Sequence, residues 1–114
     1  MLSFASSLCL LLTVGLLLAA PASAAERGTA SSARVVRLKD SFFSPARVTL
    51  ARGGAVRFVW AGELVHNLLG PGVPRRLETP VRRRRPFTRT FRRAGRFLFT
   101  CSIHPGMDMT VRVR

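Results

Sequence analysis

Apolar and polar residues alternate over several short stretches of the chain. In residues 55–61 (AVRFVWA), every second residue from Val56 to Trp60 is apolar, so that these side chains would share one face. Such a period of two is typical of a β-strand with one buried face. Comparable stretches predict five further strands, at residues 35–38 (VVRL), 47–50 (RVTL), 87–91 (FTRTF), 96–101 (RFLFTC) and 109–114 (MTVRVR).

Turn-forming residues separate these stretches. Asp40-Ser41, Ser44-Pro45, Gly53-Gly54 and Ala94-Gly95 lie between predicted strands. Residues 62–86 contain three glycines and four prolines, a density that excludes a long helix. No stretch shows the period of an amphipathic helix. Short strands separated by turns rich in glycine and proline predict an all-β sandwich or barrel.

The first 24 residues have a different character. Residues 8–20 (LCLLLTVGLLLAA) form a nearly unbroken apolar run, and Pro21 and the small residues Ala22–Ala24 follow it. The run is shorter than the ~20 residues of a membrane span, and its order is typical of a secretory signal peptide, although no Lys or Arg precedes it. We therefore predict a signal peptide at residues 1–24, a polar linker at 25–33 and one domain at 34–114.

This organisation predicts an exported protein, located in the periplasm or outside the cell, or held at the membrane if the signal is not cleaved. Cys9 would be removed with the signal peptide. Cys101 would then be the single cysteine of the mature chain.

The chain is strongly basic, with 19 Lys and Arg against 5 Asp and Glu and a formal net charge of +14. Ten of the arginines lie between Arg75 and Arg96, including the run Arg82–Arg85. Such a charge favours acidic proteins, anionic lipid or nucleic acid as partners. The basic segment lacks Tyr and Trp for stacking on bases, and export also disfavours nucleic acid. An acidic redox partner or an anionic membrane surface fits better, beside the simpler interpretation of a solvated face.

Several potential metal ligands lie close together in residues 101–107 (CSIHPGM), where a thiol, an imidazole and a thioether fall within seven residues. Soft sulfur ligands with imidazole suit copper, and two histidines, one cysteine and a distant axial methionine define a blue-copper site. The only other histidine of the chain is His66. The sequence therefore predicts a copper ion bound by His66, Cys101, His104 and Met107.

Simpler interpretations exist for each of these residues. Cys101 alone could be a small buried residue at a strand end, and each histidine an ordinary loop residue. A zinc site would use paired motifs such as CxxC, and methionine suits zinc poorly. A catalytic cysteine would need a basic histidine and an orienting group; Asn67 could supply the latter, but Met107 would then have no role. We therefore expect no enzyme activity.

Met109 is the alternative axial ligand, because it lies five residues after His104 instead of three. Its simpler interpretation is a core residue on the same strand face as Val111 and Val113. We favour Met107.

Taken together, these motifs resemble the plastocyanin and amicyanin group of cupredoxins. The resemblance runs from about Phe42 to Arg114 and is carried by F-x-P at 43–45, G-G-x-V-x-F-x-W at 53–60, H-N at 66–67 and F-x-F-x-C-x-x-H-P-x-M at 97–107. It implies a cupredoxin-like Greek-key β-sandwich of eight strands with one copper ion near one end.

The resemblance also implies that Asn67 ties the two ligand loops together and donates its backbone N–H to the Cys101 sulfur. Two features depart from the family pattern. One is the run Arg82–Arg85, and the other is Met109, where the amicyanin-like pattern usually has glycine.

We therefore expect a monomeric one-electron carrier that cycles between Cu(I) and Cu(II) and meets a redox partner with an acidic docking surface. The family implies that electrons pass through the exposed edge of His104, with an apolar rim that Leu68, Leu69 and Pro71 could supply. The alternative is a protein that binds and delivers copper without transferring electrons. Such carriers tend to use open sites rich in Met and His, which this sequence lacks.

Overall fold

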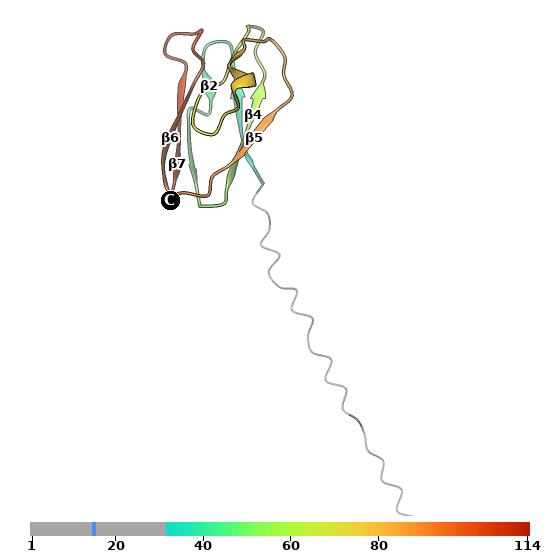
Figure 1. Ribbon diagram of the computed structural model, residues 1–114, viewed down its shortest axis with the longest axis vertical. Coiled ribbons are helices and arrows are strands. Elements are labelled where there is room, and N and C mark those ends of the chain that lie inside the picture. The colour runs from blue at the N-terminus through green and yellow to red at the C-terminus, as the bar shows by residue number, and fades with distance from the viewer. Residues whose placement is uncertain (1–14, 16–31) are drawn as a thin grey trace, which may run out of the picture.

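The computed structural model describes Gly15 and residues 32–114, so that the rest of the predicted signal peptide and most of the linker lie outside the described residues. Seven strands form the domain (Figure 1). They are β1 (Arg34–Leu38), β2 (Phe43–Ser44), β3 (Arg47–Leu50), β4 (Ala55–Trp60), β5 (Phe87–Thr90), β6 (Gly95–Thr100) and β7 (Asp108–Val113). All six strands predicted from the alternation are present. The two-residue β2 was not predicted, and the described residues hold seven strands where the resemblance implied eight.

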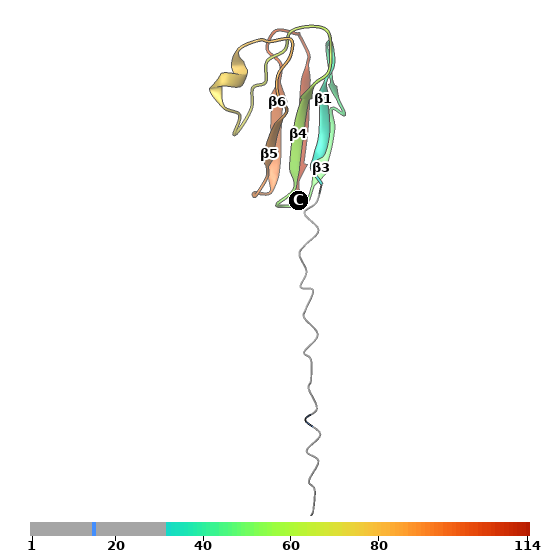
Figure 2. The same ribbon diagram turned by 90° about the vertical axis from the view of Figure 1, so that its right-hand side faces the viewer.

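The strands form two sheets that pack face to face (Figure 2). One sheet has the order β2-β1-β4-β5 and the other the order β3-β7-β6. The β1–β4 and β3–β7 pairs are parallel, whereas β1–β2, β4–β5 and β6–β7 are antiparallel. The predicted all-β sandwich is thus confirmed. In the described part of the chain, no helix is long and apolar enough to cross a membrane.

The core lies between the sheets and comes from the inward faces that the alternation predicted. Phe58 of β4 and Phe99 of β6 are fully buried, and their ring centroids lie 5.1 Å apart. Phe91, which follows β5, meets Phe99 edge-on at 6.0 Å. Because β6 ends at Thr100, one residue after Phe99, packing of this ring in the core fixes the position from which the loop 101–107 starts.

The long connection between β4 and β5 is irregular, as predicted, but its backbone is held at several points. Its one regular element is the short 3₁₀ turn η1 (Arg75–Glu78). His66 and Val81 exchange two backbone hydrogen bonds of 3.0 Å, and Leu69 and Thr100 exchange two of 2.9 Å. These bridges lie on either side of Asn67, so that the connection is attached both to itself and to the end of β6.

Arg89 of β5 covers the edge of the aromatic core. Its guanidinium carbon lies 4.1 Å from the ring centroid of Phe91, 4.9 Å from that of Phe97 and 5.8 Å from that of Phe99. Partial burial lowers the pKa of Arg89, but an arginine stays protonated at any ordinary pH. The side chain thus combines a cation–π contact with packing of its methylene groups.

Replacement of this arginine should therefore weaken the fold. Arg89→Ala should lower the free energy of unfolding by about 1–2 kcal/mol, since it removes the cation–π contact and the covering methylenes. Arg57→Ala is the matched control, because Arg57 is an exposed arginine on the neighbouring strand β4, and its effect should stay within about 0.5 kcal/mol. Urea denaturation of the two variants gives the comparison. Equal losses would mean that the aromatic contact does not stabilise the domain.

Candidate metal centre

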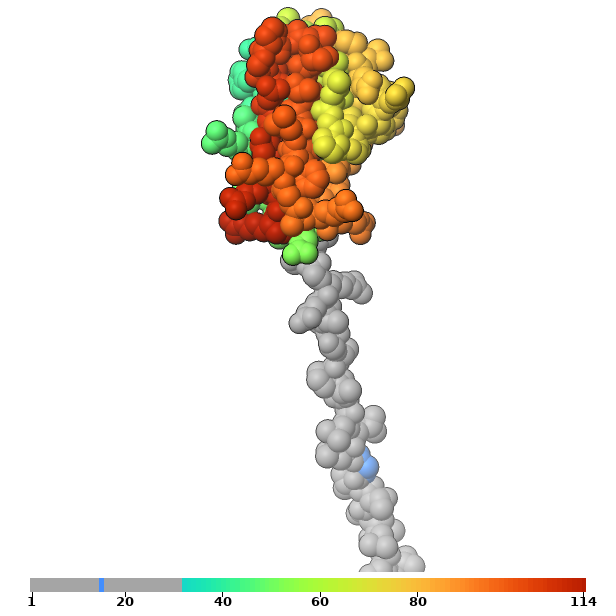
Figure 3. All heavy atoms as spheres, turned by 60° about the vertical axis from the view of Figure 1, so that its left-hand side comes forward, coloured from blue at the N-terminus to red at the C-terminus, as the bar shows by residue number. Residues whose placement is uncertain are grey.

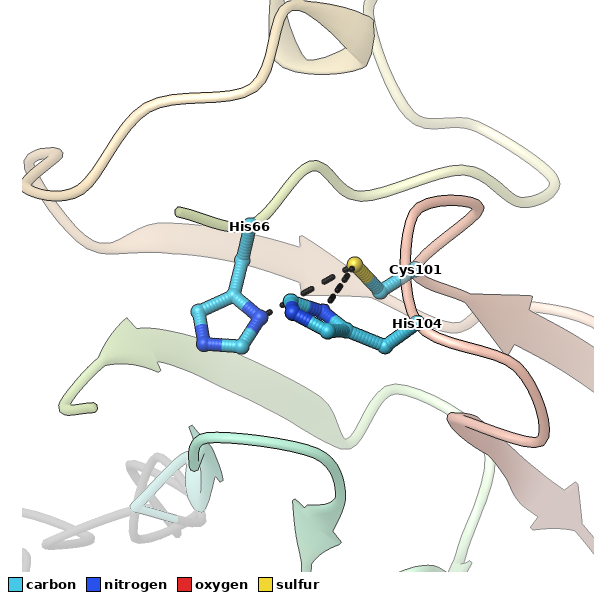
Figure 4. Close-up of side chains that lie close together, drawn as sticks. All are labelled: His66, Cys101 and His104. Carbon is cyan, nitrogen blue, oxygen red and sulfur yellow. Dashed lines mark hydrogen bonds between the residues drawn. The ribbon is translucent and has the colours of Figure 1, made fainter. Parts of the chain in front are cut away.

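Three potential metal ligands from two separate segments meet at one end of the sandwich. His66 belongs to the connection between β4 and β5, Cys101 follows β6 directly, and His104 lies in the loop before β7. The Sγ atom of Cys101 lies 3.8 Å from Nδ1 of His66 and 3.4 Å from Nδ1 of His104. Figure 4 shows both rings turning a nitrogen toward the sulfur. The ligand atoms of the three residues lie within 4.8 Å of one another.

These separations fit one shared metal ion. Bonds of about 2.3 Å to thiolate sulfur and about 2.0–2.1 Å to imidazole nitrogen, the zinc values, would place sulfur and nitrogen roughly 3.6–3.8 Å apart at trigonal or tetrahedral angles. The two observed distances, 3.4 and 3.8 Å, lie close to that range. An ion could therefore bind with little movement of the side chains. The structure thus brings together the two histidines and the cysteine that the sequence singled out.

The loop that carries Cys101 and His104 is closed by its own backbone. The N–H of Cys101 donates to the carbonyl of Met107 at 3.0 Å, and the N–H of Met107 donates to the carbonyl of His104 at 3.1 Å. The Thr100 hydroxyl adds a bond of 3.1 Å to the same Met107 carbonyl. Gly106 has a φ of 75°, in the left-handed region that favours glycine, so that this residue permits the tight return of the loop.

Asn67 joins the two ligand segments. Its Oδ1 accepts the N–H of Ser102 at 2.9 Å, and its Nδ2 donates to the Ser102 hydroxyl at 2.8 Å and to the Glu78 carbonyl at 3.0 Å. The expected connection between the loops is therefore present. The expected bond from the Asn67 backbone N–H to the Cys101 sulfur is not among the hydrogen bonds of the described residues.

The three ligands differ in their access to solvent. His66 is fully buried and Cys101 is 1% exposed, whereas His104 is partly exposed. Burial lowers the pKa of His66, the nearby His104 lowers it further, and the carboxylate of Asp40 opposes both effects. A lowered pKa keeps His66 neutral, which is the form that binds a metal. The Nε2 atom of His66 is buried without a hydrogen-bond partner among the described residues.

The segment before His66 is held by charged residues that the sequence did not assign to the site. A carboxylate oxygen of Asp40 accepts the N–H groups of Glu63 at 2.6 Å and Leu64 at 3.2 Å, and these bonds lower the pKa of Asp40. Glu63 forms an ion pair with Arg82, which lowers the pKa of Glu63, and a second one with Arg83 at 3.5 Å.

The run Arg82–Arg85 is therefore more than a solvated face. Besides its ion pair with Glu63, Arg83 donates to the Gly62 carbonyl at 2.7 Å. Arg84 is half-buried, donates to the Thr79 carbonyl at 3.1 Å and lies 5.7 Å from the ring centroid of Trp60. The indole of Trp60 in turn donates to the His66 carbonyl at 3.2 Å. Arg82 and Arg83 thus join the two ends of the connection between β4 and β5, and Arg84 packs on the Trp60 ring whose indole holds the His66 carbonyl.

The two candidate methionines occupy different environments, although both are buried. Met109 is part of β7 and shares its inward face with Val111 and Val113, as its simpler interpretation predicted. Met107 lies outside the strand, in the loop that carries Cys101 and His104. This arrangement favours Met107 as the fourth ligand, and the assignment stays a prediction.

The expected apolar rim is partly wrong. Leu68 is fully buried, so that its side chain cannot contact a partner protein. Leu69 is partly buried and Pro71 is exposed. Three further large apolar residues within two positions of a predicted ligand are exposed, namely Leu64, Val65 and Ile103, with exposed fractions of 47%, 46% and 38%.

Comparison with known proteins identifies the fold. No family model matches the sequence, and no curated protein matches it either. Among solved structures, the chain is similar to oxidised plastocyanin from the fern Dryopteris crassirhizoma (TM-score 0.56, 24% identity, 70% of this chain and 99% of that one). It is also similar to a purple cupredoxin from Nitrosopumilus maritimus (0.58, 18%, 71% and 99%) and to a reduced amicyanin variant (0.57, 22%, 75% and 85%). The resemblance noted in the sequence is thus confirmed at the level of the fold.

The amide of Asn67 offers a direct test of how the ligand segments are held. Asn67→Ala should lower the free energy of unfolding of the metal-free protein by about 1–3 kcal/mol, because it leaves the buried partners of the amide unsatisfied. Ser102→Ala removes only the hydroxyl and keeps the backbone bond to Oδ1, so it should cost about 1 kcal/mol or less. Chemical denaturation measures both values. A loss no greater for Asn67→Ala than for Ser102→Ala would contradict the role given to the amide.

Proposed function

Because the chain has the cupredoxin fold, we propose that it is an exported copper protein that carries one electron at a time. Copper would be held by His66, Cys101 and His104, with Met107 as the axial ligand. The observation that supports this most directly is the buried cluster of one thiol and two imidazoles, whose separations suit one ion.

The donor set favours copper over the commoner alternatives. Thiolate and imidazole ligands with a methionine nearby match the trigonal copper sites that transfer electrons. Structural zinc sites use four Cys or His ligands, and the described residues supply only three at this end. Bound copper would supply the one-electron step between Cu(I) and Cu(II). The protein supplies ligands already close to their bonding positions, which limits rearrangement between the two states.

His104 is the ligand best placed to pass electrons to a partner. It is partly exposed, while His66 and Cys101 are closed off from solvent. The exposed side chains of Leu64, Val65 and Ile103 lie next to ligands in the sequence and could form the apolar part of a docking surface. The basic residues would attract a partner with an acidic surface.

Electron transfer also suits the site better than copper delivery does. Two ligands are almost fully buried, and hydrogen bonds through Asn67 hold the two ligand segments together. Such a closed site favours retention of the ion over its transfer. Export is supported by the apolar run at residues 8–20 and the small residues after it.

The visible spectrum of the purified protein with Cu(II) tests the ligand set. The wild type should show an intense charge-transfer band from thiolate to copper. Cys101→Ser should abolish this band, and His66→Ala and His104→Ala should weaken or alter it. Ser102→Ala is the matched control beside Cys101 and should keep the band. A Cys101→Ser protein as strongly coloured as the wild type would refute copper binding by this thiolate.

The axial assignment predicts different effects for the two methionines. Met107→Leu should change the reduction potential and the spectrum of the copper form, because the axial ligand tunes both. Met109→Leu should mainly change stability, by less than about 1.5 kcal/mol, since it conserves volume in the core. Voltammetry and denaturation of the two variants make the comparison. The opposite pattern would assign the axial position to Met109.

Electrostatic attraction predicts a salt-dependent reaction. Electron transfer to an acidic partner should slow as ionic strength rises. Electrostatic steering can raise the association rate by ~10–10³-fold, and salt screens the charges that produce this increase. Arg75→Gln with Arg76→Gln, close to the metal end, should lower the rate at low salt. Arg34→Gln with Arg52→Gln, the same charge change at the opposite end, should have a smaller effect. Stopped-flow kinetics would exclude steering if the rate did not respond to salt.

A further inference from the structure

The outer face of the sheet β3-β7-β6 carries a polar groove away from the metal ligands (Figure 3, with β7 in red beside β6 in orange). The groove has a volume of about 400 Å³. Besides Val48, it is lined by three arginines and two threonines, namely Arg47, Thr49, Arg96, Thr110 and Arg112. No carboxylate and no aromatic side chain lines it, so that it offers little to a metal cation, an amine or a nucleobase.

The strand register explains why these side chains gather. Arg47 lies opposite Thr110, and Thr49 lies opposite Arg112, in the parallel pair β3–β7. On the other side of β7, Arg112 lies opposite Arg96 of β6. Strand alternation turns all five residues away from the core, because Val48 and Val111 point inward between them. Three guanidinium groups and two hydroxyl groups are thus presented from adjacent positions of one surface.

The charge in this groove is not balanced by acidic residues. Both ion pairs of the described residues involve Glu63, at the metal end. Of the described acidic residues, only Asp108 lies on this face of the sheet; it is at the end of β7, opposite Thr100 in the strand register, and it neither lines the groove nor forms an ion pair with an arginine. Meanwhile Arg96 and Arg112 face each other directly, and like charges in such a cross-strand pair destabilise a sheet. A bound anion would relieve this repulsion.

We propose that the groove is a binding site for a phosphate group. A phosphate monoester carries about −1.5 to −2 charges and three strong acceptor oxygens, so that it can engage several guanidinium groups at once. Arginine matches phosphate oxygens with parallel N–H donors, and Thr49 and Thr110 can add O–H donors. A carboxylate has only two acceptor oxygens and a single negative charge, so that it matches three guanidinium groups less well. The volume is at the lower end of small-molecule pockets, which suits a phosphorylated small molecule or a lipid headgroup.

The test is a titration of the full chain, kept under reducing conditions, with inorganic phosphate at constant ionic strength. Changes in the amide NMR chemical shifts report binding. Saturable shifts should concentrate on residues 47–49, 96 and 110–112. Arg96→Gln and Arg112→Gln should each weaken binding about tenfold or more, because each removes a charge-assisted contact. Arg57→Gln is the control: it makes the same charge change at an exposed position of the other sheet and should alter the affinity less than about threefold.

Two results would overturn the proposal. One is the absence of saturable shifts on this face. The other is an equal loss of affinity in Arg57→Gln, which would mean that phosphate responds only to the net charge. Because the groove does not involve the metal ligands, the Cu(II) spectrum reports independently on the proposed copper site.

A second titration identifies the source of the phosphate group. Glycerol phosphate presents a monoester, whereas glycerophosphoglycerol presents the diester of an anionic lipid headgroup. Tighter binding of the monoester would assign the site to free phosphate or a phosphorylated small molecule. Binding of the diester at least as tight as that of phosphate would assign it to a lipid surface.

Discussion

The candidate metal centre depends on the hydrogen bonds between Asn67 and Ser102. His66 and Cys101 are 35 residues apart and belong to different segments, one of which has little regular structure of its own. The Asn67 amide satisfies both the backbone N–H and the hydroxyl of Ser102, the residue after Cys101. A paired contact of this kind fixes both the distance and the orientation of the segment that carries His66 relative to the loop that carries Cys101 and His104.

A second layer of polar contacts stabilises this arrangement from the side of His66. Asp40, beyond the end of β1, holds the backbone of Glu63, and Glu63 is in turn paired with Arg82 and Arg83. Individual surface ion pairs contribute little to the free energy of folding. Here they act with backbone hydrogen bonds on one short segment, which restricts the irregular connection that supplies the first histidine. Arg82 and Arg83 therefore help to position the segment that carries His66, and the other basic residues remain available to attract partners.

Most of the strands and the cluster of His66, Cys101 and His104 could be predicted from the sequence. Period-two alternation depends on adjacent residues, Cys101 and His104 lie in one short loop, and His66 is the only other histidine of the sequence. The parts that could not be predicted depend on contacts across the fold. The role of Asp40 arises from a bond to a residue 23 positions away. Leu68 was expected at the surface because its neighbours gave no sign that its segment bridges to Thr100 and turns the leucine inward.

The burial of Cys101 also bears on the chemical durability of the protein. A disulfide requires two sulfur atoms about 2.05 Å apart and Cα atoms within about 7 Å. With only 1% of Cys101 exposed, two molecules cannot bring their thiols so close while the loops remain folded. Soluble oxidants meet the same barrier, because thiol oxidation follows exposure as well as thiolate character. The burial of Cys101 in the folded domain therefore protects its thiol from covalent dimerisation and over-oxidation.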